Sequence, residues 1–135
     1  MIFFGRFLPM TVVSFLFVGI GLLMWSLSGG GARLESVRVP DFSPLAAAGE
    51  ATFNAYCAEC HGANASGTDQ GPPLLHNTYN PGHHGDESFT IAVSHGVPGH
   101  HWSYGNMPPQ PDVAEHDVAA VVRYVRELQQ ANGIK

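Results

Sequence analysis

The stretch Cys57-Ala58-Glu59-Cys60-His61 decides how this chain of 135 residues folds. Its two cysteines are the only ones present, so a disulfide framework cannot hold the domain together. A disulfide between them would also close too short a loop to be free of strain. The chain is 44% hydrophobic but only 13% charged, which indicates one small domain plus an apolar segment. A domain of this size needs a further source of stability besides its small hydrophobic core.

The spacing Cys-x-x-Cys-His is the pattern that attaches a c-type haem, in which both thiols bind the haem and the imidazole binds its iron. Two alternatives stay open. A zinc site needs about four ligands, and histidines are plentiful, although no second cysteine pair is present. A thioredoxin-like redox pair should follow a strand, and no strand pattern precedes Cys57. The motif therefore favours one covalent haem c.

From about residue 43 to 134, the chain resembles a small class I cytochrome c with one haem. Gly49, Phe53 and Cys57 have that family's Gly-x-x-x-aromatic-x-x-x-Cys spacing. The resemblance implies that Gly49 lets the first and last helices cross closely, with Tyr124 packed over it. It also implies an all-α fold around one covalent haem.

The segment Gly71-Pro72-Pro73-Leu74 matches the family's Gly-Pro-x-Leu motif. By resemblance, the Pro72 carbonyl accepts a hydrogen bond from the free ring nitrogen of His61. Such a partner fixes the tautomer of a ligating histidine and strengthens it as a ligand. Leu74 is counted among the haem-binding residues.

The segment Gly105-Asn106-Met107-Pro108 resembles the family's loop that carries the sixth iron ligand, and implies that Met107 and His61 bind the iron. The other methionines all lie in the apolar N-terminal segment, so Met107 is the only thioether left for the haem domain. The alternative is a histidine, which would give a lower reduction potential. Seven imidazoles besides His61 are available: His76, His83, His84, His95, His100, His101 and His116.

Five of these histidines, His83, His84, His95, His100 and His101, fall within 19 positions. Such a cluster is compatible with a second metal ion, copper or zinc. Loop histidines that face solvent, or that bind haem propionates or backbone, need no metal, and this interpretation is preferred. Trp102 and Tyr104, just before Met107, are assigned by the resemblance as rings packed on the haem with a polar tip toward a propionate.

Three helices are expected. The first covers residues 44–58, and the second opens at Asp86 and stops at Gly96. The third should begin with a capping box formed by Asp112 and Glu115. Its apolar positions recur at helical intervals, at Val118, Val121, Val122, Val125 and Leu128. No segment shows strand alternation.

The N-terminal segment carries no charge between Arg6 and Arg33, and residues 7–27 are long and apolar enough to span a bilayer and contact its lipid. We therefore expect a single transmembrane anchor over residues 1–28, a flexible linker over 29–42 and the haem domain over 43–135. A cleaved signal peptide is the alternative, but its apolar region should be shorter. The flanking charges do not orient the segment.

The charge pattern excludes nucleic acid as a partner, because the net charge is −5 and no basic face is available. From Leu34 onward, four basic residues stand against all eleven acidic ones, a formal balance of −7. The lysine ring with which some cytochromes c meet acidic oxidases is absent. A partner surface is then either basic or largely uncharged.

These expectations describe a one-electron carrier rather than an enzyme, held in a bacterial inner membrane with its haem domain in the periplasm. The resemblance implies partners such as a quinol-oxidising cytochrome bc complex as donor, and a terminal oxidase or photosynthetic reaction centre as acceptor. The chain could serve as a shuttle between such complexes or as a subunit of one. A peroxidase-like haem enzyme and a copper-handling or sensing module are the alternatives.

Overall fold

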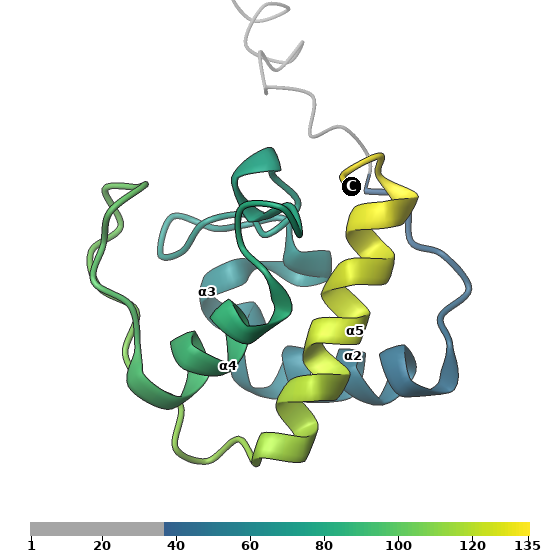
Figure 1. Ribbon diagram of the computed structural model, residues 1–135, viewed down its shortest axis with the longest axis horizontal. Coiled ribbons are helices and arrows are strands. Elements are labelled where there is room, and N and C mark those ends of the chain that lie inside the picture. The colour runs from purple at the N-terminus through teal and green to yellow at the C-terminus, as the bar shows by residue number, and fades with distance from the viewer. Residues whose placement is uncertain (1–36) are drawn as a thin grey trace, which may run out of the picture. The chain divides into compact units, whose positions relative to one another are not determined.

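The computed structural model describes residues 37–135 (Figure 1). Its elements, in chain order, are α2 (Pro44–Tyr56), α3 (Ala58–His61), the 3₁₀ turns η1 (Ala63–Ala65) and η2 (Asn77–Tyr79), α4 (Asp86–His95) and α5 (Glu115–Ala131). Within this part of the chain there is no strand, only an isolated antiparallel bridge between Val97 and Met107. The expected all-α class is confirmed for residues 37–135.

The first expected helix is present but divided. Ser43 caps the start of α2, where its hydroxyl accepts the Ala46 N–H at 3.3 Å, and Pro44 occupies the first turn. The helix ends at Tyr56, and α3 begins after Cys57. The backbone thus bends at the first cysteine of the motif, and the second cysteine lies on a separate short helix.

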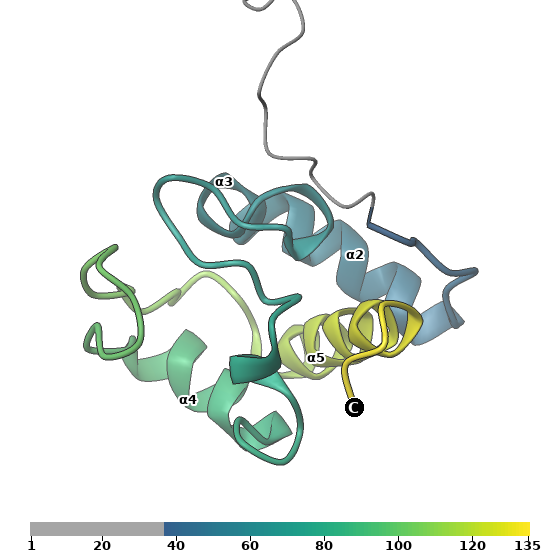
Figure 2. The same cartoon turned by 90° about the horizontal axis from the view of Figure 1, so that it is seen from above.

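The core is formed where α5 lies across α2 (Figures 1 and 2). A Cβ atom at Gly49 would overlap the Ala120 carbonyl of α5, so only glycine allows the two backbones this close approach. One turn further along α5, the buried Tyr124 ring packs against Phe53 at 5.2 Å and against Phe42 at 5.1 Å between ring centroids. The predicted close crossing is confirmed.

Helix α5 presents the expected apolar face to the core, and all five predicted positions are buried. The predicted capping box is wrong. The helix begins at Glu115 after Ala114, which makes no side-chain cap, and Asp112 lies outside the helix. Instead, the buried Val113 packs with Val118 of the second turn, an arrangement known as a hydrophobic staple.

Helix α4 has the predicted limits. It starts at Asp86 after Gly85 and ends at Gly96, whose φ of +74° stops the helix. Its Phe89 packs against the main core around Tyr124 and also against a smaller cluster formed by Val113, Val118 and Val122. Val93 packs against the smaller cluster. A space lies between α3, α4 and the loops that join them.

The segment that precedes α2 is hydrogen-bonded to the residue that follows α5. Asn132 accepts the Arg38 N–H through its side-chain oxygen and donates to the Arg38 carbonyl, both at 2.9 Å. The last residues of the expected linker, 37–42, are therefore packed on the domain. The expected anchor and the rest of the linker lie outside the described residues. Among residues 37–135, no helix is long and apolar enough to cross a bilayer.

Candidate haem site

His61 is the last residue of α3, and its half-buried side chain faces the space between α3 and α4. Its Nδ1–H donates to the Pro72 carbonyl at 2.9 Å, the contact implied by the family resemblance. Burial lowers the pKa of His61, and the hydrogen bond to Pro72 opposes this only in part. The ring is therefore neutral near pH 7, with its Nε2 lone pair available to a metal.

Cys57 and Cys60 line the same space as His61. Burial, together with the neighbouring Cys60 thiol, raises the pKa of Cys57 to about 11. The Cys57 thiol is thus protonated at neutral pH, unlike a redox cysteine with a lowered pKa. This argues against the thioredoxin-like alternative.

Met107 reaches this space from a loop beyond α4. Two backbone hydrogen bonds of 2.9 Å, exchanged between Val97 and Met107, hold the ends of that loop together. Gly96 permits this, because a Cβ atom there would lie 2.5 Å from the Met107 carbonyl. The Gln110 N–H donates to the Val93 carbonyl at 2.7 Å and ties the following residues to α4.

The space itself is a cavity of about 270 Å³. Apart from the motif residues, its wall is made mostly of apolar side chains from α2, α4, α5 and the loops. They include Phe53, Leu74, Phe89, Val93, Val97 and Val121. Leu74, predicted as a site residue, is buried and belongs both to this wall and to the main core.

Trp102 and Tyr104 also line the cavity, but they differ in environment. The Trp102 indole N–H donates to the Tyr79 hydroxyl at 3.0 Å, whereas Tyr104 is 40% exposed. Burial raises the pKa of Tyr79, so its hydroxyl stays protonated. Sequence reasoning missed Tyr79, since no pattern links it to a tryptophan 23 positions away.

The residues around the cavity fit a covalent haem. The His61 imidazole and the Met107 thioether line a single, mostly apolar cavity, and the Cys57 and Cys60 thiols line it as well, at the spacing that haem attachment requires. A zinc site at the motif does not fit, because none of the clusters of possible metal ligands among the described residues includes Cys57, Cys60 or His61. The fold and the site together define a small helical haem protein.

The family model for cytochrome c matches residues 46–129. The chain belongs to the cytochrome c family, and as such it carries covalently bound haem c and has an electron-carrier role. A search of curated proteins and a search of solved structures each found no significant match.

Proposed function

We propose that this cytochrome c is a membrane-tethered one-electron carrier whose haem iron is bound by His61 and Met107. The observation that carries the proposal is that these two side chains line one apolar cavity although they belong to different parts of the fold. The Cys57 and Cys60 thiols would hold the haem covalently. When bound, the haem supplies a one-electron iron couple.

The protein's own residues contribute position and burial. Pro72 holds the His61 ring in one tautomer through its carbonyl. The Val97–Met107 bridge fixes the backbone of Met107, and the buried Leu74 forms part of the cavity wall. We assign Trp102 and Tyr104 to the haem environment, with Trp102 held by Tyr79.

Two iron ligands from the protein favour electron transfer over a peroxidase reaction. A peroxidase needs an open iron position, which the Met107 sulfur would close. The cavity wall is mostly apolar, and such a wall controls the access of water to a metal and its reduction potential.

The ligand assignment predicts that Met107→His lowers the reduction potential, because axial methionine raises it and axial ligands span a range of about 0.8 V. The oxidised native protein should show the weak sulfur-to-iron absorption band at the near-infrared edge, and the variant should lack it. His101→Ala serves as the matched control for the histidine alternative and should retain the band. A native protein without the band, whose potential is unchanged by Met107→His, would show that a histidine is the ligand.

We further propose that residues 1–28 anchor the chain in a bacterial inner membrane and that the haem domain lies in the periplasm. The support is the uncharged span between Arg6 and Arg33 and the outer-face location of haem attachment that the family resemblance implies. Arg6 would then face the cytoplasm. Proposed partners are redox complexes of the same membrane, a quinol-oxidising cytochrome bc complex as donor and a terminal oxidase or reaction centre as acceptor.

A further inference from the structure

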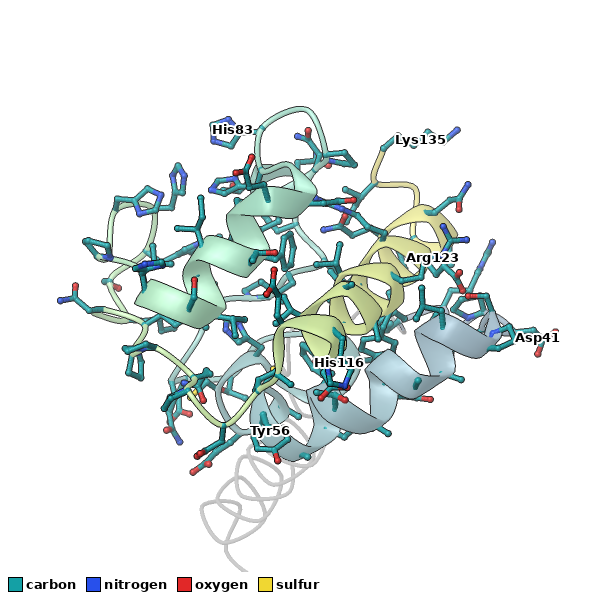
Figure 3. The ribbon with its side chains drawn as sticks, turned by 60° about the horizontal axis from the view of Figure 1, so that its bottom comes forward. Asp41, Tyr56, His83, His116, Arg123 and Lys135 are labelled. Carbon is teal, nitrogen blue, oxygen red and sulfur yellow. The ribbon has the colours of Figure 1, made fainter. Side chains whose placement is uncertain are left out.

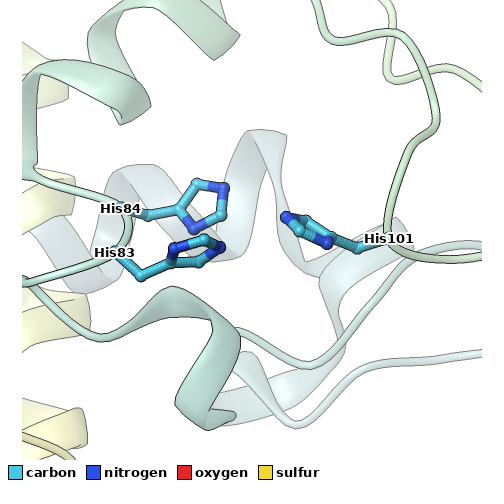
Figure 4. Close-up of side chains that lie close together, drawn as sticks. All are labelled: His83, His84 and His101. Atoms are coloured by element: carbon cyan, nitrogen blue, oxygen red, sulfur yellow. The ribbon is translucent and has the colours of Figure 1, made fainter.

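Four histidines from two loops gather at one edge of the domain. His83 and His84 lie in the loop between η2 and α4, and His100 and His101 lie in the loop that leads to Met107. Ring centroids are 5.3 Å apart for His84 and His101, and 5.5 Å apart for His83 and His101. One ring nitrogen from each of His83, His84 and His101 lies within 4.8 Å of the others, as the converging rings in Figure 4 show.

Backbone carbonyls bind one ring nitrogen of two of these histidines and so orient the other nitrogen. His84 Nδ1 lies 2.6 Å from the Thr78 carbonyl, and His100 Nδ1 lies 2.8 Å from the Pro98 carbonyl. A nitrogen that faces a carbonyl must carry the hydrogen, so Nε2 of each ring holds the free lone pair. Histidines that bind metals are oriented in this way by a carbonyl partner. Backbone bonding of these histidines, expected from the sequence, is therefore compatible with metal binding.

The loop that carries His83 and His84 is itself held in place. The Asn80 side-chain oxygen accepts the His83 N–H at 3.0 Å, and the Arg126 guanidinium donates to the His84 carbonyl. Two imidazoles on adjacent residues are thus presented from a fixed backbone. The third ring comes from the opposite loop, so an ion bound by all three would join the two loops.

We propose that His83, His84 and His101 form a binding site for one divalent transition-metal ion of the kind that imidazole favours, Zn²⁺ or Cu²⁺, with His100 beside it. Three imidazoles and one open position are a common ligand set for Zn²⁺. With zinc–nitrogen bonds of about 2.0–2.1 Å, tetrahedral ligand atoms lie about 3.4 Å apart. The ligand atoms already lie within 4.8 Å of one another, and rotation of the exposed His83 and His101 side chains would bring them to this separation.

The site would be distinct from the iron site yet adjacent to it. His84 and His101 also line the haem cavity, whereas His83 does not. Replacement of His83 therefore removes a metal ligand without changing the cavity wall. The net negative charge of the chain favours uptake of a cation in general, so the test must separate the cluster from the acidic surface.

The test is calorimetric titration of the full-length haem-loaded protein, freed of metal with a chelator, with zinc chloride alone. We expect saturable binding of one Zn²⁺ per chain, tighter binding of Cu²⁺ and no binding of Mg²⁺. His83→Ala should weaken Zn²⁺ binding at least tenfold, since even outer partners of metal ligands typically change affinity 10- to 100-fold. His83→Gln provides a second variant of closer size. The electron-paramagnetic resonance spectrum of the Cu²⁺ form should show nitrogen ligation that is reduced in His101→Ala.

The matched control is the double variant His95→Ala/His116→Ala, which removes two exposed imidazoles outside the cluster. Figure 3 shows His116 well away from His83. The control should bind Zn²⁺ like the native protein. Absence of saturable binding, equal binding by His83→Ala and the native protein, or equal binding of Mg²⁺ and Zn²⁺ would each overturn the proposal.

Discussion

At the scale of single residues, Gly49 has the clearest structural role. Its missing side chain lets the backbone of α2 approach the Ala120 carbonyl of α5, and this crossing places Phe53 and Tyr124 in contact. Phe53 is also part of the haem cavity wall. The contact between two backbones therefore determines the position of one side of the site.

Gly49→Ala is predicted to lower the free energy of unfolding by about 2 kcal/mol or more, because the added Cβ overlaps a backbone oxygen that cannot turn away. Denaturant titration of the haem-loaded protein measures this change. The matched control is Ala48→Leu, which adds more volume at the neighbouring exposed position and should stay within about 0.5 kcal/mol of the native protein. A larger loss for the control than for Gly49→Ala would contradict the role given to the crossing.

The residues of the site were predictable to different degrees. The positions of Cys57, Cys60 and His61 follow from a local motif, and Pro72 and Met107 follow from short motifs of the family. Tyr79 was not predictable, because its role depends on the Trp102 indole N–H that reaches it across the fold. The gathering of His83 with His101 likewise depends on how two loops fold back, which no spacing reveals.

At the scale of elements, α5 supports the haem side of the domain as well as the core. The Arg126 guanidinium donates to the Tyr79 carbonyl at 2.8 Å, to the His84 carbonyl and to Asp86 at 2.7 Å. The buried Gln129 amide donates to the Leu74 and Tyr79 carbonyls, each at 2.9 Å. Two side chains of α5 thus bind the backbone carbonyl oxygens of the segment between Leu74 and His84.

Arg126→Met should lower the free energy of unfolding by about 2 kcal/mol or more, because the part-buried His84 carbonyl loses its donor and the Tyr79 carbonyl loses one of its two donors. The comparison variant is Asp86→Asn. Asp86 is 69% exposed, so the loss of its ion pair should cost less than about 1 kcal/mol. Urea unfolding of both variants measures the two losses in free energy, and so compares the carbonyl contacts of Arg126 with its ion pair to Asp86. Equal losses would mean that the ion pair, rather than the carbonyl contacts, is the important interaction.

The limits of the helices were predicted unevenly. Helix α4 begins and ends as predicted because acidic residues and a glycine mark its two ends. The start of α5 was misjudged because Asp112 and Glu115 have the spacing of a capping box, whereas burial of Val113 against Val118 actually sets the helix start. Polar residues and glycine therefore predicted the limits of α4, whereas an apolar contact determined the start of α5.

At the scale of the whole domain, the segment that precedes α2 and the loop that carries Met107 lie on different sides. In both Figure 1 and Figure 2, the segment before α2 (blue) lies at the right and the loop that carries Met107 (green) lies at the left. The proposed tether would then join the domain on the side away from the Met107 loop.

The proposed anchor predicts that protein extracted from membranes has the intact mass of residues 1–135 plus one haem. The apolar span is longer than a signal peptide needs, so it should not be removed. Mass spectrometry of the membrane and soluble fractions provides the measurement. A mature chain that begins near Gly31 and is found in the soluble fraction would overturn the anchor.

The proposed tether also predicts a weak salt dependence of electron transfer. A carrier confined to its partner's membrane gains little from long-range attraction, and the domain has no lysine ring for steering. Turnover in native membranes should therefore change little from ~10 mM to ~300 mM salt, where the screening length falls from about 30 Å to under 8 Å. A tenfold or greater fall would instead indicate reversible docking on a basic surface.

The Val97–Met107 bridge has a consequence for how this protein can vary or be engineered. Because two hydrogen bonds close the loop at its base, residues can be added between them without displacing the backbone of Met107, as long as His101, Trp102 and Tyr104 keep their contacts. Doubling the length of a flexible loop costs only about 0.6 kcal/mol in closure entropy. Added recognition residues would therefore lie beside the haem cavity while the backbone of Met107 stays in place.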